Sequence, residues 1–287
     1  MFIIMGATGN VGGAVADELL RKGERVTILT RHPHEATAWD AKGATIAEAD
    51  ANDSASLRTA FRLGRRAFLL NPPALPNGDT DATERRTIAN ILSALAGCDL
   101  EKVVAVSTYG ARAGDAIGDL STLWELEEGL RSQPTPAAIN RGAYYMTNWL
   151  GFVDAVRATG KLPSMFPADT EMPMVAPFDL GRAAAERLLS APEDTATWYV
   201  EGPARYTPKQ VAAAIGAALG QEVDVDVAPR AAWEDVFKGA GFSPEAASAY
   251  ARMTAVSLDN DFDKPADPVR GMVDLETFIR AAVGRPS

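Results

Sequence analysis

The stretch from residue 2 to residue 13 constrains the fold more than any other part of the chain. It reads Phe-Ile-Ile-Met and then Gly-Ala-Thr-Gly-Asn-Val-Gly-Gly. An uninterrupted apolar run predicts a strand buried on both faces, and the closely spaced glycines predict a sharp turn. A helix should follow, because Val11, Val15 and Leu19 recur at helical spacing and Gly23 stands where a helix end favours φ > 0.

A strand, a glycine turn and a helix N-terminus together form an anion site, because free N–H groups and the helix dipole point at the turn. The pyrophosphate of a dinucleotide fits such a site. The spacing is G-x-x-G-x-x-G instead of the commoner G-x-G-x-x-G, and a tight turn without a ligand is the alternative. The flanking strand and helix favour the dinucleotide. The candidate cofactor-binding residues of the turn are Gly6, Thr8, Gly9, Asn10, Val11 and Gly12.

Composition limits the classes of protein to consider. The chain has 287 residues, 47% of them apolar and 23% charged, which is typical of a globular protein with one large domain or a core domain and a smaller appendage. No apolar run approaches the roughly 18 residues of a membrane span, and the start lacks a basic signal region. The lone Cys98 cannot form an intrachain disulfide, so we expect the cytoplasm. A net charge of −10 argues against nucleic-acid binding.

Histidine and cysteine are too scarce for several kinds of site. The only histidines are His32 and His34, and the only cysteine is Cys98. A Ser-His-Asp triad, a Cys-His pair or a His/Cys zinc site elsewhere in the chain is therefore excluded. Residues 259–263 begin like a calcium-binding EF-hand loop but lack its glycine and its closing glutamate, so we interpret them as a solvated acidic loop. We expect no metal.

Strand and helix patterns alternate after the first helix. Further strands are expected at 25–30, 44–50, 67–70 and 102–107, with helices at 54–61 and 83–96 and a mobile loop at 75–83. This alternation predicts an α/β fold: a Rossmann-type, doubly wound parallel sheet with right-handed crossovers. Such sheets bind ligands at the carboxyl ends of their strands. Those ends are Gly6, Arg31, Asp50, Asn71 and Ser107.

The second strand ends in Thr30 and Arg31, where a dinucleotide fold meets the adenosine ribose. An acidic residue there accepts from a free 2′-OH, whereas a guanidinium matches a 2′-phosphate. The sequence therefore favours NADP(H) over NAD(H). The alternative is a merely exposed arginine.

A helix from 144 to 156 is expected to follow the sixth strand, which ends at Asn140 and Arg141. One face of it, with Tyr145 and Trp149, should belong to the core. Tyr144 and Asn148, on a neighbouring face, are substrate candidates, together with Phe166 in the segment that follows.

The expected domains are an NAD(P)-binding domain at 1–156, with a returning segment near 174–201, and a smaller, mostly helical substrate domain at 157–287. Its expected elements are helices at 180–189, 207–219, 231–239, 244–257 and 274–283 and strands at 198–200 and 223–227.

Several motifs resemble the NmrA-like branch of the atypical short-chain dehydrogenases/reductases. They are Gly-Ala-Thr-Gly-Asn-Val-Gly at 6–12, Thr-Arg at 30–31, Ala-Asp at 49–50, Leu-Leu-Asn-Pro-Pro at 69–73, Val-Ser-Thr-Tyr-Gly-Ala at 106–111 and Ile-Asn-Arg-Gly at 139–142. The resemblance continues to about Phe278. It implies NADP(H) or NAD(H) binding, with either reduction of quinones and other carbonyl compounds or redox sensing. The cofactor contacts it implies are Thr30, Arg31, Asp50, Ala51, Asn71, Pro72, Pro73, Ser107, Thr108, Tyr109, Asn140 and Arg141.

The chain departs from the wider superfamily at its acid-base pair. Catalytically typical members have Tyr-x-x-x-Lys, but here Tyr109 is followed four positions later by Ala113. The Lys or His that family members often place before the next helix falls near Leu123 or Trp124. Without a cation, the Tyr109 phenol should keep a pKa of about 10, which suits it poorly to proton transfer at neutral pH. Tyr109 is thus a weak catalytic candidate, and an aromatic wall of the nicotinamide pocket is the alternative.

Three functions remain open. The first is an NADP(H)-dependent oxidoreductase that passes hydride to a flat quinone-like, enone or carbonyl substrate without a Tyr-Lys pair. The second is a non-catalytic NADP(H)-binding redox sensor that regulates a partner protein. The third, an epimerase or isomerase with tightly bound NAD, is disfavoured by Arg31 and the missing Lys.

Overall fold

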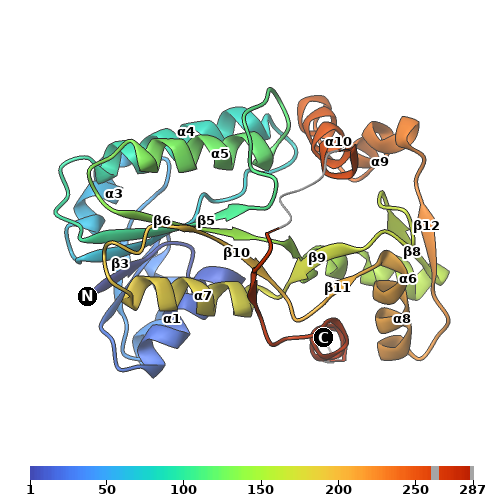
Figure 1. Cartoon of the computed structure of the whole chain (residues 1–287), viewed down its shortest axis with the longest axis horizontal. Coiled ribbons are helices and arrows are strands. Elements are labelled where there is room, and N and C mark those ends of the chain that lie inside the picture. Colours follow the sequence, from blue (N-terminus) through green and yellow to red (C-terminus); the bar gives the residue numbers. More distant parts are fainter. Residues whose placement is uncertain (260–264, 285–287) are drawn as a thin grey trace.

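A central parallel sheet organises the computed structural model, which describes residues 1–259 and 265–284 (Figure 1). The strand order is β13-β10-β6-β5-β4-β1-β2-β3, and every pair is parallel. Its strands are β1 (Phe2–Ile4), β2 (Val26–Thr30), β3 (Thr45–Glu48), β4 (Arg66–Leu69), β5 (Lys102–Thr108), β6 (Ala137–Gly142), β10 (Thr197–Glu201) and β13 (Val269–Arg270). The Rossmann-type sheet expected from the sequence is confirmed.

Helices cover both faces of this sheet (Figure 1). One face carries α1 (Asn10–Arg21) and α7 (Pro177–Leu189), and the other carries α3 (Ser54–Phe61), α4 (Thr80–Leu95) and α5 (Asp119–Arg131). A short turn, η1 (Pro33–Glu35), and α2 (Thr37–Ala41) follow β2. The apolar strand run at the start of the chain explains this layering, because Ile3 and Ile4 are both fully buried and belong to core clusters on opposite faces.

The second half of the chain builds a separate apolar core around Trp149, Leu162 and Ile215. Its strands form two small sheets, β11-β9-β7 and β12-β8. They are β7 (Tyr144–Tyr145), β8 (Lys161–Ser164), β9 (Met172–Val175), β11 (Arg205–Tyr206) and β12 (Asp224–Val227). The helices are η2 (Met146–Phe152), α6 (Val153–Thr159), α8 (Pro208–Leu219), η3 (Arg230–Ala232), α9 (Trp233–Gly239), α10 (Pro244–Asp259) and α11 (Leu275–Val283). Thr207 and Gln210 form the expected capping box of α8.

The helix predicted for 144–156 is wrong over most of its length. Tyr144 and Tyr145 form β7, which pairs with β9, and η2 is a 3-10 helix, so only the last turns are α-helical. Backbone pairing with a strand about 30 residues later overrides the local helical periodicity. Of the face predicted to be buried, Trp149 and Val156 are almost fully buried, whereas Tyr145 and Phe152 are only partly buried.

Other elements begin earlier than expected. Helix α4 starts at Thr80, inside the loop predicted for 75–83, because the Asp79 side chain caps it by accepting from the Ala82 N–H. Helix α7 starts at Pro177, a residue suited to a first helical turn. Part of the loop predicted for 259–263 lies outside the described residues.

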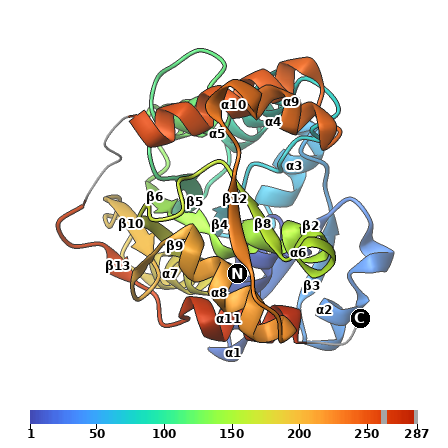
Figure 2. The same cartoon turned by 90° about the vertical axis from the view of Figure 1, so that its right-hand side faces the viewer.

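Helices α9 and α10 form a hairpin that lies beside α4 and α5 (Figures 1 and 2). Phe237, Phe242 and Tyr250 hold the hairpin together through tilted and edge-on ring contacts. Ser243 attaches it to the loop before α4, because its N–H donates to the Pro76 carbonyl at 2.8 Å and its hydroxyl to the Gly78 carbonyl at 2.9 Å. The hairpin is therefore bonded to the segment that follows β4.

The close packing of α1 on α7 predicts that a side chain larger than glycine at their contact destabilises the protein. A Cβ on Gly181 would lie 2.5 Å from the Ala14 Cβ and 2.8 Å from the Val11 carbonyl oxygen. We expect Gly181→Ala to lower the free energy of unfolding by about 1–3 kcal/mol in urea titrations, because this overpacking outweighs the helix propensity of alanine. Gly239→Ala, at a helical glycine with open space around it, is the control. Equal stability of both variants would contradict this packing.

Candidate functional site

The glycine turn between β1 and α1 is shaped to receive an anion. Gly6 has φ +67, and a Cβ on Gly12 would overlap the Gly6 carbonyl, so only glycine fits at both positions. Helix α1 begins after Gly9 with no side-chain cap and no acidic residue in its first turn. Its first N–H groups are therefore free for a ligand. Thr8, Gly9 and Asn10 are exposed at the turn, as a binding surface requires.

The end of β2 presents a cation. Arg31 is exposed and forms no ion pair with any described residue, while the Thr30 hydroxyl accepts from the His32 N–H at 3.1 Å. Because β2 pairs directly with β1, Arg31 lies on the same sheet edge as the glycine turn. The arrangement suits a phosphate near this strand end.

The ends of β3 and β4 carry polar groups that order their own loops. The Asp50 carboxylate accepts from the Asn52 N–H at 2.9 Å, and the Ala51 carbonyl accepts from the Asn90 side chain. The Asn71 side chain accepts from the Thr87 hydroxyl at 2.6 Å. Pro72 and Pro73 follow Asn71 at the carboxyl end of the sheet. These contacts fix the loops in which the predicted cofactor-binding residues lie.

At the end of β5, Ser107 is buried and its hydroxyl has no hydrogen-bond partner in the part of the chain that the structure describes. An unpaired buried hydroxyl at a ligand-binding edge is the kind of group that a cofactor would satisfy. Thr108, the last residue of β5, is half-buried at the same edge.

The side chain of Tyr109 is buried and hydrogen-bonded within the protein. Its hydroxyl donates to the Glu201 carboxylate at 3.0 Å, and its ring meets Tyr199 edge-on. Glu201 is fully buried and also accepts from Arg205 at 2.9 Å and from Arg270 at 2.7 Å. Burial and the Glu201 charge raise the pKa of Tyr109 well above its ordinary value, so the expectation of an unchanged pKa is wrong. These contacts argue against a proton-donating role for Tyr109, and the aromatic wall of a nicotinamide pocket stays a prediction.

The side chains of Asn140 and Arg141 form hydrogen bonds to other residues of the protein. Their contact with a cofactor stays a prediction. Asn140 is fully buried and its Oδ1 accepts from Arg187 at 3.3 Å. Arg141 forms two hydrogen bonds of 2.9 Å to the buried Glu127 and contacts Tyr199. The sequence correctly placed both residues near the end of a strand, at the edge of the sheet. It could not predict their hydrogen-bond partners, because these lie far away in the chain.

The three predicted substrate residues lie together. Asn148 is near enough to Tyr144 to act on its pKa, and the Phe166 ring meets the Tyr144 ring edge-on with centroids 5.6 Å apart. Burial raises the pKa of Tyr144 to about 12. This group combines two aromatic rings and a polar amide, which is the composition of many small-molecule sites.

Sequence reasoning missed a pair of carboxyl groups near the same edge. Glu84 on α4 is buried, and the carboxyl group of Asp119, the first residue of α5, is near enough to act on its pKa. Burial, followed by the Asp119 charge, raises the pKa of Glu84 to about 8, and burial raises the pKa of Asp119 as well. A signal was present in the sequence, because Asp81 and Glu84 share the helical face of Ile88 and Ile91.

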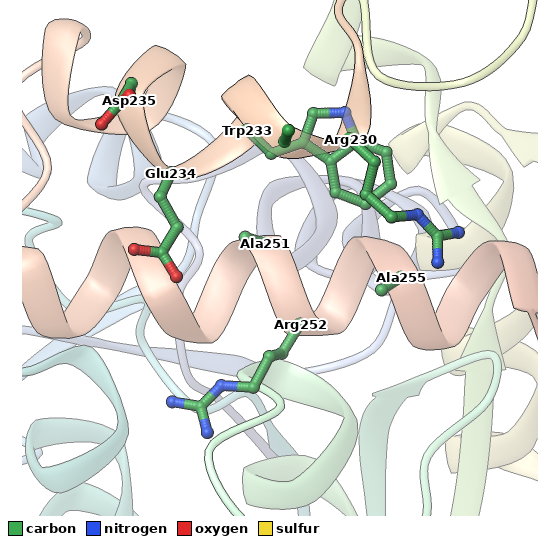
Figure 3. Close-up of a pocket in the computed structure, with 8 residues that line it drawn as sticks. Arg230, Trp233, Glu234, Asp235, Ala251, Arg252 and Ala255 are labelled. Atoms are coloured by element: carbon green, nitrogen blue, oxygen red, sulfur yellow. The ribbon is translucent and has the colours of Figure 1, made fainter.

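A surface pocket of about 320 Å³ lies between α9 and α10 (Figure 3). Trp233 and Arg230 line one side, and the guanidinium lies 5.2 Å from the indole ring. Figure 3 shows Glu234 pointing toward α10 and Arg252 pointing away from α9. The pocket shares no residue with the predicted cofactor set. The described residues also contain no group of His, Cys, Asp and Glu that could hold a metal ion, and no helix suited to cross a membrane.

Comparison with known proteins identifies a family. A model of the NmrA-like family matches residues 1–279. The chain belongs to the NmrA-like family. The resemblance inferred from the motifs is thereby confirmed.

Quinone oxidoreductase 2 of Escherichia coli (strain K12) is 24% identical over 225 residues, 78% of this chain and 76% of that protein. An NAD(P)H azoreductase of Xenophilus azovorans is 21% identical over 287 residues, 100% of this chain and 94% of that protein. Among solved structures, the Citrobacter sp. triphenylmethane reductase complexed with NADP(H) matches with a TM-score of 0.82 and 18% identity, covering 98% of this chain and 99% of that one. This structural likeness shows a shared fold.

The carboxyl pair predicts a pH dependence of stability. The folded protein retains a proton that the unfolded chain releases above its ordinary glutamate pKa of 4.5. The retained proton therefore makes its full contribution to the free energy of unfolding below pH 4.5, and this contribution is lost as the pH rises toward 8. We expect Glu84→Gln to gain at least about 1 kcal/mol relative to the wild type between these limits, measured by urea unfolding at several pH values. Glu245→Gln, at an exposed glutamate, should show no such trend.

The Tyr109 contact predicts a modest cost of removing its hydroxyl. Glu201 would keep both arginine partners, so Tyr109→Phe should lower the free energy of unfolding by about 1 kcal/mol. Urea titration measures this change. A loss of more than about 4 kcal/mol would show that the phenol contributes more than one hydrogen bond.

Proposed function

We propose that this protein is an NAD(P)H-dependent oxidoreductase that passes hydride to a flat, quinone-like or enone/carbonyl acceptor. The observation that carries the proposal is the glycine turn, where a Gly6 with positive φ and a Gly12 without room for a Cβ leave the α1 N–H groups open to an anion. Its relatives include a quinone oxidoreductase and an NAD(P)H azoreductase, which reduce small molecules according to their names.

The described residues fit a dinucleotide. The glycine turn would hold the pyrophosphate, and the unpaired Ser107 hydroxyl would meet the cofactor at the β5 end. When bound, the nicotinamide supplies a hydride. The group formed by Tyr144, Asn148 and Phe166 would orient a flat acceptor by ring contacts and one polar contact. The protein thus contributes positioning and apolar enclosure.

We further propose that NADP(H) is preferred and that the protein works in the cytoplasm. Arg31 supports the preference, because it is exposed at the end of β2 with no described ion-pair partner, and a guanidinium pairs well with a 2′-phosphate.

A second candidate is a redox sensor that binds NADP(H) without turnover and engages a partner protein. The commitment of the Tyr109 hydroxyl to Glu201 supports it, because the phenol expected near the nicotinamide is then not free to donate a proton. Turnover of a quinone panel separates the two functions. Tight cofactor binding without any turnover would favour the sensor.

Calorimetric titration with NADPH and NADH tests the cofactor preference. We expect Arg31→Ala to weaken NADPH binding by about 10–100-fold and to leave NADH binding nearly unchanged, because one charge-assisted contact to the 2′-phosphate is lost. Arg25→Ala, at an exposed arginine just before the opposite end of β2, is the matched control. If the wild type binds neither nucleotide, the glycine turn is only a turn and both candidate functions fail.

A further inference from the structure

The 2′-phosphate that distinguishes NADPH from NADH carries more charge than one arginine neutralises. A phosphate monoester has a charge of about −1.5 to −2 at neutral pH and three oxygens that accept hydrogen bonds. Arg31, directly after β2, supplies one positive charge. If the proposed preference for NADP(H) holds, a second donor is expected beside Arg31.

The next lysine along the chain is already paired. Lys42, which follows α2, donates to the Asp17 carboxylate on α1 at 2.6 Å, and its ammonium lies 4.4 Å from the centre of the Trp39 ring. That ring packs against α1, because a Cβ on Gly13 would lie 3.7 Å from it. Lys42 is therefore held against α1 and does not supply the second charge.

Two imidazoles lie directly after Arg31. His32 and His34 are both exposed, and their ring centroids are 5.9 Å apart, so the two rings form one patch beyond the end of β2. They are the only histidines of the chain. A protonated imidazole has two N–H donors and a positive charge, and both suit a phosphate.

The two histidines differ in their partners. His34 Nε2 lies 3.7 Å from Glu35 Oε1, so this imidazole already has a carboxylate beside it. The His32 ring touches that of His34 but forms no hydrogen bond or ion pair with any residue in 1–259 and 265–284. The ring nitrogens of His32 are therefore free for a ligand.

The backbone of His32 is held in place before a ligand binds. Its N–H donates to the Thr30 hydroxyl at 3.1 Å, and its carbonyl accepts from the Glu35 N–H at 2.9 Å. Pro33, the first residue of η1, fixes the next φ angle. Because β2 pairs with β1, His32 lies on the sheet edge that carries the glycine turn. A binding group held in this way loses little conformational freedom when a ligand arrives.

We propose that His32 binds the 2′-phosphate of NADPH together with Arg31, and that it does so in its protonated form. The selection of NADPH over NADH then depends on pH, because imidazole side chains change charge between about pH 5 and 8. The inference rests on the proposed preference for NADP(H) and adds the residue that makes this preference respond to pH.

Other charges surround this turn. Helix α2 and strand β3 (Figure 2) both pack against η1. The charged and titratable groups of the turn and of these two elements are Arg31, His34 and Glu35, Asp40 on α2, Lys42 after it, Glu48 on β3 and Asp50 after it. These groups are present with and without a ligand. A bound phosphate adds negative charge beside His32 and favours the protonated imidazole, so binding should take up a proton.

Calorimetric titration in two buffers of different ionisation enthalpy measures this proton. At about pH 7.5 we expect the wild type to take up about half a proton for each NADPH bound and none for NADH. A 2′-phosphate held by Arg31 alone would take up no proton, because a neighbouring cation favours loss of the last phosphate proton. Proton uptake therefore distinguishes the imidazole from the arginine.

Affinities of matched variants give a second readout. We expect His32→Gln to abolish the proton uptake and to weaken NADPH binding by about 10-fold at pH 6.5 but by less than about 2-fold at pH 8.5, with NADH binding unchanged. His34→Gln is the matched control, since this neighbouring imidazole already faces Glu35, and it should keep the uptake. Both side chains are exposed, so both variants should fold.

The outcomes separate this inference from the proposed cofactor preference. Absence of proton uptake in the wild type, or the same uptake in His32→Gln, would overturn the role of His32 and leave the preference that Arg31 supports. Loss of the uptake in His34→Gln instead of His32→Gln would overturn the assignment to His32. Equal affinity of the wild type for NADPH and NADH at both pH values would overturn the preference and this inference together.

Discussion

The buried carboxylate of Glu201 joins the two halves of this protein. It lies at the end of β10 with no exposure to solvent and accepts hydrogen bonds from Tyr109, Arg205 and Arg270. Tyr109 directly follows β5, while Arg205 is on β11 and Arg270 on β13, so one charge connects the eight-stranded sheet to the three-stranded sheet. A buried charge is costly unless it is paired and hydrogen-bonded. Moving any of the three partners away would leave the Glu201 carboxylate less well paired, which disfavours such movement.

This interaction also explains what the site does not contain. Tyr109, the weak catalytic candidate of the sequence analysis, follows β5, and its hydroxyl donates to a carboxylate that comes 92 residues later. On the side of the sheet covered by α4 and α5, Glu84 and Asp119 come near each other because the two helices pack side by side, not because of any local motif.

The features that depend on local residue patterns were predicted correctly from the sequence. The run of apolar residues before Gly6 and the alternation of strands and helices determined the sheet, and glycine spacing identified the turn. Residues 144–152 could not be predicted in this way, since β9 pairs with Tyr144 and Tyr145 from a distance along the chain. Side-chain partners of Asn140 and Arg141 were equally out of reach, because helices α7 and α5 supply them.

The attachment of Ser243 to the loop before α4 has a mechanical consequence. Both the backbone and the hydroxyl of Ser243 are bonded to carbonyls of that loop, and the loop continues from the predicted cofactor contacts Asn71, Pro72 and Pro73. The α9–α10 hairpin and the loop are therefore held together by two hydrogen bonds between segments 165 residues apart in the chain. If the loop borders a bound nucleotide, as we propose, a change in its position would be passed directly to the hairpin.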